Sequence, residues 1–230
     1  MARKRVVILI SGRGSNMSAL IEAAGDPGYP VEIVGVISDN AEAKGIAITA
    51  THGIETTAIT RTDYPTKDGL DAALDAELKR MEADIVCLAG YMRILSAGFA
   101  ATWAGRMINI HPSLLPLYKG LDTHARALDA GMRVHGCSVH FVTAEMDGGP
   151  IIAQAVVPVL PGDDADRLAA RVLSVEHQLY PLALRLVATG KARMEDGRTV
   201  LMGVSAEGAL LSPGSAADDF DIESLARMTP

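Results

Sequence analysis

Short apolar runs rich in β-branched residues alternate with longer amphipathic stretches along most of this 230-residue chain. The runs are RVVILI, VEIVGVIS, IETTAI, DIVCLAG and RMINIHP, and segments of helical periodicity lie between the first four, near 17–24, 41–51 and 67–82. Continuous apolar runs are typical of strands buried on both faces, and helices between consecutive strands are typical of parallel pairing. The pattern therefore predicts an α/β, Rossmann-like fold with a mostly parallel central sheet.

The pattern changes in the C-terminal half of the chain. The runs GCSVHFVT and PIIAQAVVPV are separated only by the polar loop AEMDGG, which indicates neighbouring strands and an antiparallel portion of the sheet. A long helical segment follows from about 163 to 188, and residues 204–230 are rich in Ala, Ser, Gly and Asp with little periodicity. We therefore expect a single domain over 1–203 and a loosely ordered acidic tail over 204–230.

The composition argues against several classes of function. A formal net charge of -7 provides no basic field for a nucleic-acid backbone, so we expect no nucleic-acid partner. The two cysteines, Cys87 and Cys137, lie amid apolar or small neighbours and are expected to be reduced core residues. The apolar run after the basic N-terminus is too short for a signal peptide or a membrane span. We therefore expect a cytoplasmic protein without a membrane partner.

A glycine-rich loop, SGRGSN, lies between the first predicted strand and the first predicted helix. Free N–H groups and the helix dipole favour an anion at such a position. Gly12 and Gly14 permit positive φ, and Ser15 and Asn16 are able to cap the helix or donate to phosphate oxygens. Met17 replaces the third glycine of a dinucleotide fingerprint, and the loop lacks the lysine of a P-loop. The loop therefore predicts a phosphomonoester site, with a simple capped turn as the alternative.

The segment INIHPSLLP places an amide and an imidazole at the end of a predicted strand. Period-2 geometry puts Asn109 and His111 on one face, and Pro112 ends the strand. The carboxyl ends of parallel strands are where open α/β sheets build their sites. An amide donor beside an imidazole is suited to acyl transfer, because one stabilises an oxyanion and the other moves a proton near neutral pH. The alternative is a hydrogen-bonded core histidine.

Five motifs together carry a resemblance to a known family: SGRGSN, AGYMRIL, NIHPSLLP, HGCSVHFVTAEMDGGPII and VEHQLYP. In order and spacing they resemble the phosphoribosylglycinamide formyltransferases, over roughly residues 5–200. The resemblance implies the formyltransferase fold and transfer of a formyl group from the co-substrate 10-formyltetrahydrofolate to the amine of glycinamide ribonucleotide in purine biosynthesis. NIHPSLLP alone is less specific, since methionyl-tRNA formyltransferases, formyltetrahydrofolate deformylases and sugar formyltransferases share much of it.

The resemblance also implies roles for individual residues. Asn109, His111 and Asp147 match the family's catalytic group, although the D-G-G sequence at Asp147 is also a strong turn signal. The substrate phosphate is implied to bind at Gly14, Ser15 and Asn16. Glu176 matches the family residue beside the glycinamide amine, and the alternative for Glu176 is a solvated position on an amphipathic helix.

The folate is implied to contact two segments and one separate basic residue. By the family's pattern the folate-binding residues are Lys67, Met92, Arg93, Ile94, Leu95, Asn109, Thr143, Ala144, Glu145, Met146 and Asp147. Apolar members of this set would hold the pterin, and Arg93 would meet a carboxylate. Some family members have Arg in place of Lys67, and an arginine and a lysine do not make equivalent contacts.

The other histidines carry weaker evidence. His140 lies in a predicted strand near the site, and both a supporting polar role and a buried structural role remain open. His124, His135 and His177 are assigned no role, nor is Asp122, where some relatives have His; His52 is consistent with a helix end. No set of histidines and carboxylates has a metal-ligand spacing, so we expect no catalytic metal.

Two competing functions remain. Another formyl-folate enzyme, such as a deformylase with water as acceptor, would share the catalytic motif, but those relatives are expected to carry additional domains. A non-catalytic phosphate- or nucleotide-binding module would account for the glycine loop and leave Asn109, His111 and Asp147 unexplained. We therefore expect an enzyme of small-molecule substrates, and an oligomer is compatible with the sequence.

Overall fold

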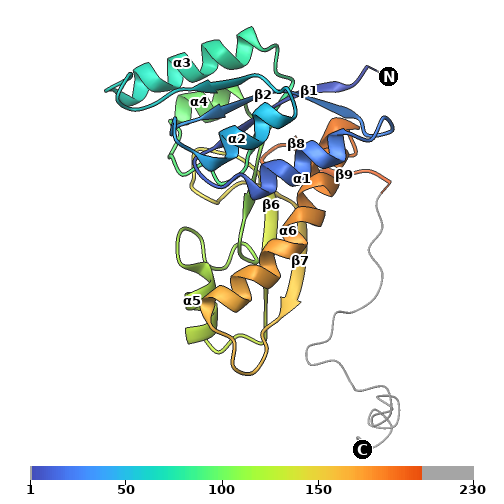
Figure 1. Cartoon of the computed structure of the whole chain (residues 1–230). Coiled ribbons are helices and arrows are strands. Elements are labelled where there is room, and N and C mark those ends of the chain that lie inside the picture. The colour runs from blue at the N-terminus through green and yellow to red at the C-terminus, as the bar shows by residue number, and fades with distance from the viewer. Residues whose placement is uncertain (1, 204–230) are drawn as a thin grey trace, which may run out of the picture.

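The computed structural model describes residues 2–203, which form a seven-stranded sheet flanked by helices (Figure 1). The strand order is β3-β2-β1-β4-β5-β6-β7. The strands are β1 Lys4–Ile10, β2 Val31–Ser38, β3 Thr56–Ala58, β4 Ile85–Leu88, β5 Met107–His111, β6 Val134–Phe141 and β7 Ile151–Pro158. Strands β3, β2, β1, β4 and β5 pair in parallel, whereas β6 pairs antiparallel with both β5 and β7. This confirms the predicted mostly parallel sheet with an antiparallel C-terminal portion, while the acidic tail predicted at 204–230 lies outside the described residues.

Six helices of the described chain cover the sheet. They are α1 Ser15–Ala24, α2 Lys44–Thr51, α3 Lys67–Arg80, α4 Ala97–Thr102, α5 Thr123–Asp129 and α6 Ala165–Ala188. Helices α3 and α4 lie on one side of the sheet and α1, α2 and α6 on the other, while α5 lies beside α6 at the end of the molecule where β6 and β7 extend (Figure 1). Among the helices of residues 2–203, none combines the length and apolar character that a membrane span requires.

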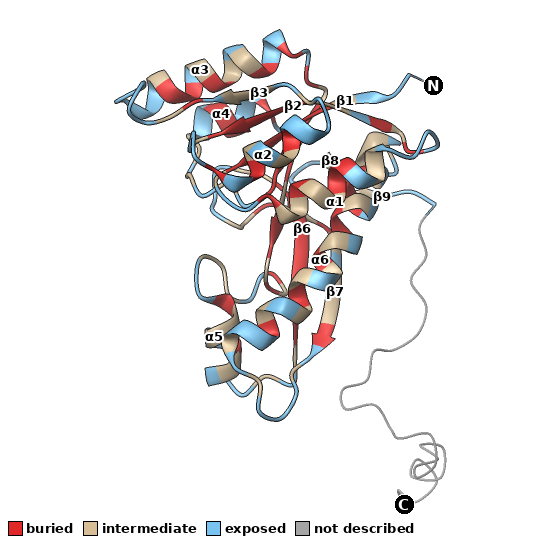
Figure 2. Cartoon of the chain, in the orientation of Figure 1, coloured by how far each residue is buried: buried red, intermediate tan, exposed pale blue. Residues whose placement is uncertain are grey.

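The first strand shows why the sheet is buried on both faces. Val6, Ile8 and Ile10 pack into the core under α1 and α6, whereas Val7 and Leu9 pack into the core under α3 and α4. All five side chains are fully buried (Figure 2). Because successive strand residues point to opposite faces, a continuous apolar run serves two cores at once. Cys87 and Cys137 are free and buried in the first of these cores, as expected.

The sequence did not predict the shorter elements. Helix α4 has only six residues and begins where the Ser96 hydroxyl accepts a hydrogen bond from the Phe99 N–H. Strands β8, Ala192–Glu195, and β9, Arg198–Leu201, form a separate antiparallel hairpin. Its two-residue turn is Asp196-Gly197, with φ of 48° and 71°. An Asp-Gly turn with two positive φ angles is a strong hairpin signal, so this element was recognisable from EDGR.

A buried tyrosine attaches α6 to the two strands next to the candidate site. The Tyr180 side chain is fully buried, and its hydroxyl lies 3.0 Å from the Leu88 carbonyl and 3.2 Å from the Ile108 carbonyl. Leu88 belongs to β4 and Ile108 to β5, so one hydroxyl donates its hydrogen between two strands. Glu176, four residues earlier, lies on the same side of the helix and is also buried.

We expect Tyr180→Phe to lower the free energy of unfolding by about 1 to 2 kcal/mol, because it removes a buried hydroxyl and its hydrogen bond while preserving the ring. Urea denaturation followed by circular dichroism measures this difference. The control is Tyr64→Phe, whose hydroxyl is on an exposed residue and should change stability far less. Equal effects of the two substitutions would contradict the structural role of the Tyr180 hydroxyl.

Candidate active site

The candidate site lies where the strand order reverses. The chain runs outward from β1 to β2 and β3, and then returns to place β4 on the other side of β1. The carboxyl ends of β1 and β4 therefore form a switch point, which is where open α/β sheets bind ligands. The Met92 N–H donates to the Ser11 hydroxyl at 2.8 Å and links the segments that follow these strands.

The glycine loop leaves the start of α1 open to an anion. Gly14 has φ of 76° and precedes the helix, and no side chain caps the first turn. A Cβ on Gly14 would lie 3.0 Å from the Cα of Gly45 at the start of α2, so this position requires both positive φ and close packing. Ser15 and Asn16 occupy the first turn of α1. The structure thus brings the three predicted phosphate-loop residues together at a helix N-terminus.

Glu176 connects the glycine loop to α6. Its Oε2 accepts a hydrogen bond from Asn16 Nδ2 at 2.7 Å, and only 6% of the residue is exposed. The alternative of a solvated surface glutamate is therefore wrong. Burial raises the pKa of Glu176 above its ordinary value of 4.5, and the Asn16 hydrogen bond opposes this shift by a smaller amount.

Asn109 lies opposite a buried histidine on the neighbouring strand. In the register of β5 and β6, Asn109 faces His140, and Asn109 Nδ2 is 3.2 Å from His140 Nε2. His140 Nδ1 lies 2.9 Å from the Phe141 carbonyl, which only accepts, so Nδ1 carries the hydrogen and Nε2 is free to accept from the amide. Burial lowers the pKa of His140, which favours this neutral form. His140 is therefore buried and also contacts Asn109, so both roles left open for it are compatible with the structure.

His111 lies between two acceptors. Its Nε2 donates to the Tyr118 carbonyl at 3.0 Å, and its Nδ1 lies 3.5 Å from Asp147 Oδ2. Both side chains are largely buried, with 8% of His111 and 11% of Asp147 exposed. A ring that faces an acceptor at each nitrogen donates to both only when it is doubly protonated. The geometry therefore suits a histidine that donates a proton or stabilises negative charge.

Asp147 is positioned by the turn between β6 and β7. Its Oδ2 accepts from the Gly120 N–H at 2.9 Å, and its Oδ1 is 3.8 Å from His140 Nε2. Asp147 has φ of 49°, a conformation that Asp and Asn tolerate better than most residues. Gly149 packs so closely on the Phe141 carbonyl that no Cβ would fit there. The D-G-G sequence is thus both a turn and the support of a site residue.

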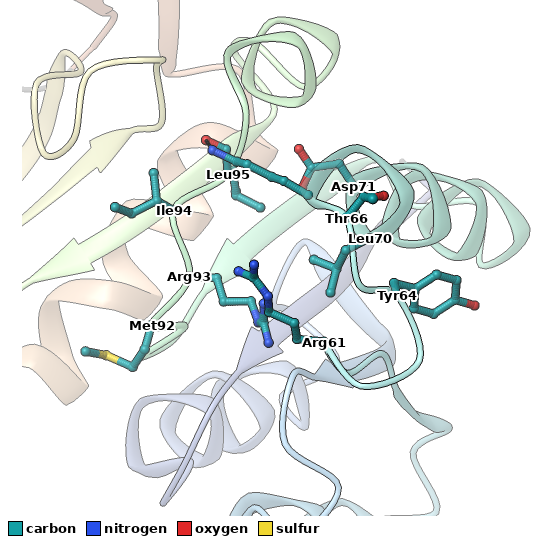
Figure 3. A pocket seen from close by; sticks show the side chains of 10 residues that line it. Arg61, Tyr64, Thr66, Leu70, Asp71, Met92, Arg93, Ile94 and Leu95 are labelled. Carbon is teal, nitrogen blue, oxygen red and sulfur yellow. Dashed lines mark hydrogen bonds between the residues drawn. The ribbon is translucent and has the colours of Figure 1, made fainter.

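Five of the predicted folate contacts line a cavity of about 370 Å³ that is formed by the segment after β3, the start of α3 and the segment after β4 (Figure 3). They are Lys67, Met92, Arg93, Ile94 and Leu95. Met92 and Ile94 are 65% and 69% exposed, which is unusual for apolar side chains and suits a surface that a ligand covers. The Lys67 ammonium donates to the Leu95 carbonyl at 3.3 Å, and Arg93 Nε lies 3.0 Å from Asp39 Oδ2.

The remaining folate candidates lie away from this cavity. Thr143, Ala144, Glu145 and Met146 lead into Asp147 in the loop between β6 and β7 and do not line the cavity. Glu145 Oε1 accepts from the Lys119 ammonium at 2.6 Å. The predicted folate residues therefore form two groups, one at the cavity and one beside His111.

Several residues at the site were missed from the sequence. Tyr118 contributes only a carbonyl to His111, and a backbone contact leaves no side-chain signal. Asp39 follows directly after β2, so its place at the carboxyl edge of the sheet was recognisable in principle. Arg61 lines the cavity from the segment after β3. Among residues 2–203, no group of three or more histidine, cysteine, aspartate or glutamate residues is arranged to hold a metal ion, and the expectation of no metal stays a prediction.

Comparison with known proteins gives the class of this site. The formyl transferase family profile matches residues 4–184, which include the glycine loop, both sides of the β5 and β6 pairing, and α6 to within four residues of its end. The chain therefore belongs to the formyl transferase family, and it is a transferase.

Individual relatives have names that are more specific than the description of the family. The phosphoribosylglycinamide formyltransferase of Escherichia coli (strain K12) is 43% identical over 215 residues, 93% of this chain and 99% of that protein. The trifunctional purine biosynthetic protein adenosine-3 of Bos taurus is 47% identical over 85% of this chain, which spans only 20% of that protein. A crystal structure of phosphoribosylglycinamide formyltransferase from Brucella melitensis has 59% identity and a TM-score of 0.79, covering 82% of this chain and 97% of that one. The resemblance found in the motifs and the predicted fold are confirmed.

His135 is a buried histidine in β6, near His111. It is fully buried, and its ring meets the edges of His124 and Tyr118 with centroids 5.2 Å and 6.0 Å away. Burial, assisted by His124, lowers the pKa of His135 to about 4, and the Pro112 carbonyl opposes this shift. His135 therefore folds as a neutral ring next to the residue whose carbonyl holds His111.

We expect this histidine to make the fold sensitive to acid. A folded-state pKa below the unfolded value of 6.5 means that the unfolded chain binds more protons, so stability falls as pH drops from 6.5 towards 4. His135→Phe, which retains the edge-on ring contacts, should lose roughly 2 kcal/mol less over this range than the unsubstituted chain. Urea unfolding at several pH values measures this, with the exposed His52→Phe as control. Parallel pH profiles for His135→Phe and the unsubstituted chain would refute the assignment.

Proposed function

We propose that this chain transfers the formyl group of 10-formyltetrahydrofolate to the amine of glycinamide ribonucleotide, giving N-formylglycinamide ribonucleotide and tetrahydrofolate. The observation that carries the proposal is the meeting of Asn109, His111 and Asp147 in a chain that also has an uncapped glycine loop and a cavity lined by both apolar and cationic side chains. The name of the relative that matches this chain along nearly its whole length supports the same acceptor.

The acceptor would bind along α1 and α6. Its phosphate would take the N–H groups and hydroxyls of Gly14, Ser15 and Asn16 at the uncapped start of α1. Its amine, in the ammonium form, would contact Glu176, the buried carboxylate that Asn16 already holds in place. Asn16 would thus contact both ends of the acceptor site, the phosphate directly and the amine through Glu176.

The donor would bind over the cavity and the 143–147 loop. Met92, Ile94 and Leu95 would cover the ring system, which would remove two strongly exposed apolar side chains from water. The free Nη groups of Arg93 would meet a donor carboxylate, since only Nε is bonded to Asp39. Lys67 would add a second cation at the same end of the cavity.

The chemistry would be addition followed by elimination. The bound ammonium first loses one proton to solvent. The neutral amine then attacks the formyl carbon, a C–N bond forms, and negative charge develops on the formyl oxygen. The second amide hydrogen of Asn109 would donate to that oxygen. The positive charge of the protonated His111 ring, which Asp147 balances, would stabilise the oxygen through space. The bond from the formyl carbon to folate N10 then breaks while one proton passes from the attacking nitrogen to N10. Acid-base groups of the chain suffice for these steps, and we propose no metal.

We further propose that residues 1–203 act as one domain, working in the cytoplasm on small molecules with neither nucleic acid nor membrane as a partner. The acidic balance of the chain supports the first of these exclusions. The two cores share one continuous sheet, which supports a single folding unit.

The direct test mixes the purified chain with glycinamide ribonucleotide and 10-formyltetrahydrofolate, or its dideaza analogue, and follows loss of the formyl donor. We expect donor loss that requires the amine and produces the formylated ribonucleotide. Donor loss at the same rate without the amine would identify water as the acceptor and favour a deformylase. Absence of donor loss under both conditions would overturn the proposed function.

We expect His111→Ala and Asp147→Asn each to reduce kcat by about 100-fold or more, because the first removes the positive charge that stabilises the developing oxyanion and the second removes the carboxylate that balances this charge. Asn retains the left-handed backbone of Asp147 and is still able to accept from Gly120, so this substitution isolates the charge. The controls are His52→Ala at the end of α2 and Asp129→Asn at the end of α5, both of which are exposed. Folded variants with normal rates would remove these residues from the mechanism.

We expect Glu176→Gln to raise the KM for glycinamide ribonucleotide by about 10-fold, because a neutral amide attracts an ammonium less than a carboxylate does. The donor KM should change far less. Because the pKa of Glu176 is raised, its carboxylate becomes protonated while pH is still above 4.5, so the acceptor KM of the unsubstituted enzyme should rise as pH falls. The Gln variant should lack this rise, and an identical pH profile would contradict the assignment.

A further inference from the structure

The cavity formed by the segments after β3 and β4 is positively charged in a chain whose formal net charge is -7. Three cations line it, Arg61, Lys67 and Arg93, against a single acidic side chain, Asp71. Asp71 is 7% exposed, and its Oδ2 accepts from the Ser96 N–H, which fixes the start of α4. The cavity therefore presents more positive than negative charge to a ligand.

The three cations differ in what they already bind. Arg93 has a counter-ion in Asp39, and Lys67 donates to the Leu95 carbonyl. Within residues 2–203, Arg61 has neither a hydrogen-bond nor an ion-pair partner. Arg61 is thus the cation of this cavity whose charge is left unmatched.

Two of these cations approach each other from different parts of the sheet. Arg61 comes from the segment after β3, Arg93 comes from the segment after β4, and their side chains point toward one another in the cavity (Figure 3). Like charges that converge repel, and an anion between them relieves the repulsion. Arg93 lies deeper, with 23% of its side chain exposed, whereas Arg61 is exposed at the rim. An anionic ligand would therefore extend from Arg93 outward to Arg61.

The rest of the lining indicates which anion this is. Leu70, Ile94 and Leu95 form an apolar wall next to the cations, so the ligand joins an apolar body to an anionic end. On the proposed function this body is the aryl part of the formyl-folate and Arg93 takes its first glutamate. Folates also carry chains of γ-linked glutamyl residues, which are flexible and bear one free carboxylate per unit. Such a chain would leave the cavity past Arg61.

We infer that Arg61 binds the carboxylates of γ-linked glutamyl residues beyond the first in the formyl donor, and so determines the enzyme's preference for donor chain length. The inference rests on the proposed function. A guanidinium at the rim suits this ligand because its planar fork takes carboxylates in pairs and its exposure permits several positions of a flexible chain.

The test compares KM for monoglutamyl and pentaglutamyl donors in the unsubstituted chain, in Arg61→Gln and in the control Arg198→Gln. Arg198 is an exposed arginine of β9 that also has no ion-pair partner among the described residues. We expect a lower KM for the pentaglutamyl donor, and we expect Arg61→Gln to reduce this advantage by about 3-fold to 5-fold, as for an exposed ion pair. The advantage should also shrink as NaCl rises from ~20 mM to ~500 mM.

Each outcome is decisive. The inference is overturned if the ratio of monoglutamyl to pentaglutamyl KM is as large in Arg61→Gln as in Arg198→Gln. Equal KM values for the two donors in the unsubstituted chain would also overturn it. Inorganic phosphate tests for a general anion site. If phosphate inhibits the unsubstituted chain with both donors, and Arg61→Gln removes this inhibition equally with both, then Arg61 belongs to a general anion site and the inference is overturned. Failure of the proposed function would be visible separately, because the unsubstituted chain would then turn over neither donor in the presence of the amine.

Discussion

The antiparallel pairing of β5 with β6 is the constraint on which the site depends. Residues 112–133, which include α5, connect the two strands, and the turn that follows β6 carries Asp147. This register places Asn109 opposite His140 and brings Asp147 within reach of His111. A shift by one residue would turn Asn109 and His111 to the other face of the sheet. The geometry of the candidate site is therefore a consequence of strand register.

The second requirement is the docking of α6. Its inward face carries Tyr180 against the backbones of β4 and β5 and, one turn earlier, Glu176 against Asn16. The helix thus joins the strands next to the candidate site to the glycine loop after β1. Burial at this interface also sets the chemistry, because the same removal from water that stabilises the packing raises the pKa of Glu176. Structure and proposed acceptor binding share one interface.

The sequence predicted those parts of the site whose contacts are local in the chain and missed those that depend on residues far apart in the sequence. Strand β1 and the glycine loop were predictable because periodicity and glycine chemistry are local. Asn109 and His111 were placed on one face by the same reasoning. Asp147 and Glu176 gained their roles only through resemblance, since their partners lie 36 and 160 residues away along the chain. Local patterns carry no information on such contacts, and Glu176 alone would have been read as a surface residue.

Charge placement at the switch point links the two proposed substrates. The glycine loop presents N–H groups and a helix dipole at the uncapped start of α1, which act over a short range and favour an anion that fits, and its one cation, Arg13, is exposed. The cavity instead uses the side chains of Arg61, Lys67 and Arg93, whose fields reach further and tolerate a flexible anion. The hydrogen bond from the Met92 N–H to Ser11 links the segment of the glycine loop to a segment that lines the cavity. The proposed phosphorylated acceptor would thus meet mainly backbone N–H groups, whereas the proposed acidic donor would meet mainly cationic side chains, and this difference would let the site distinguish the two.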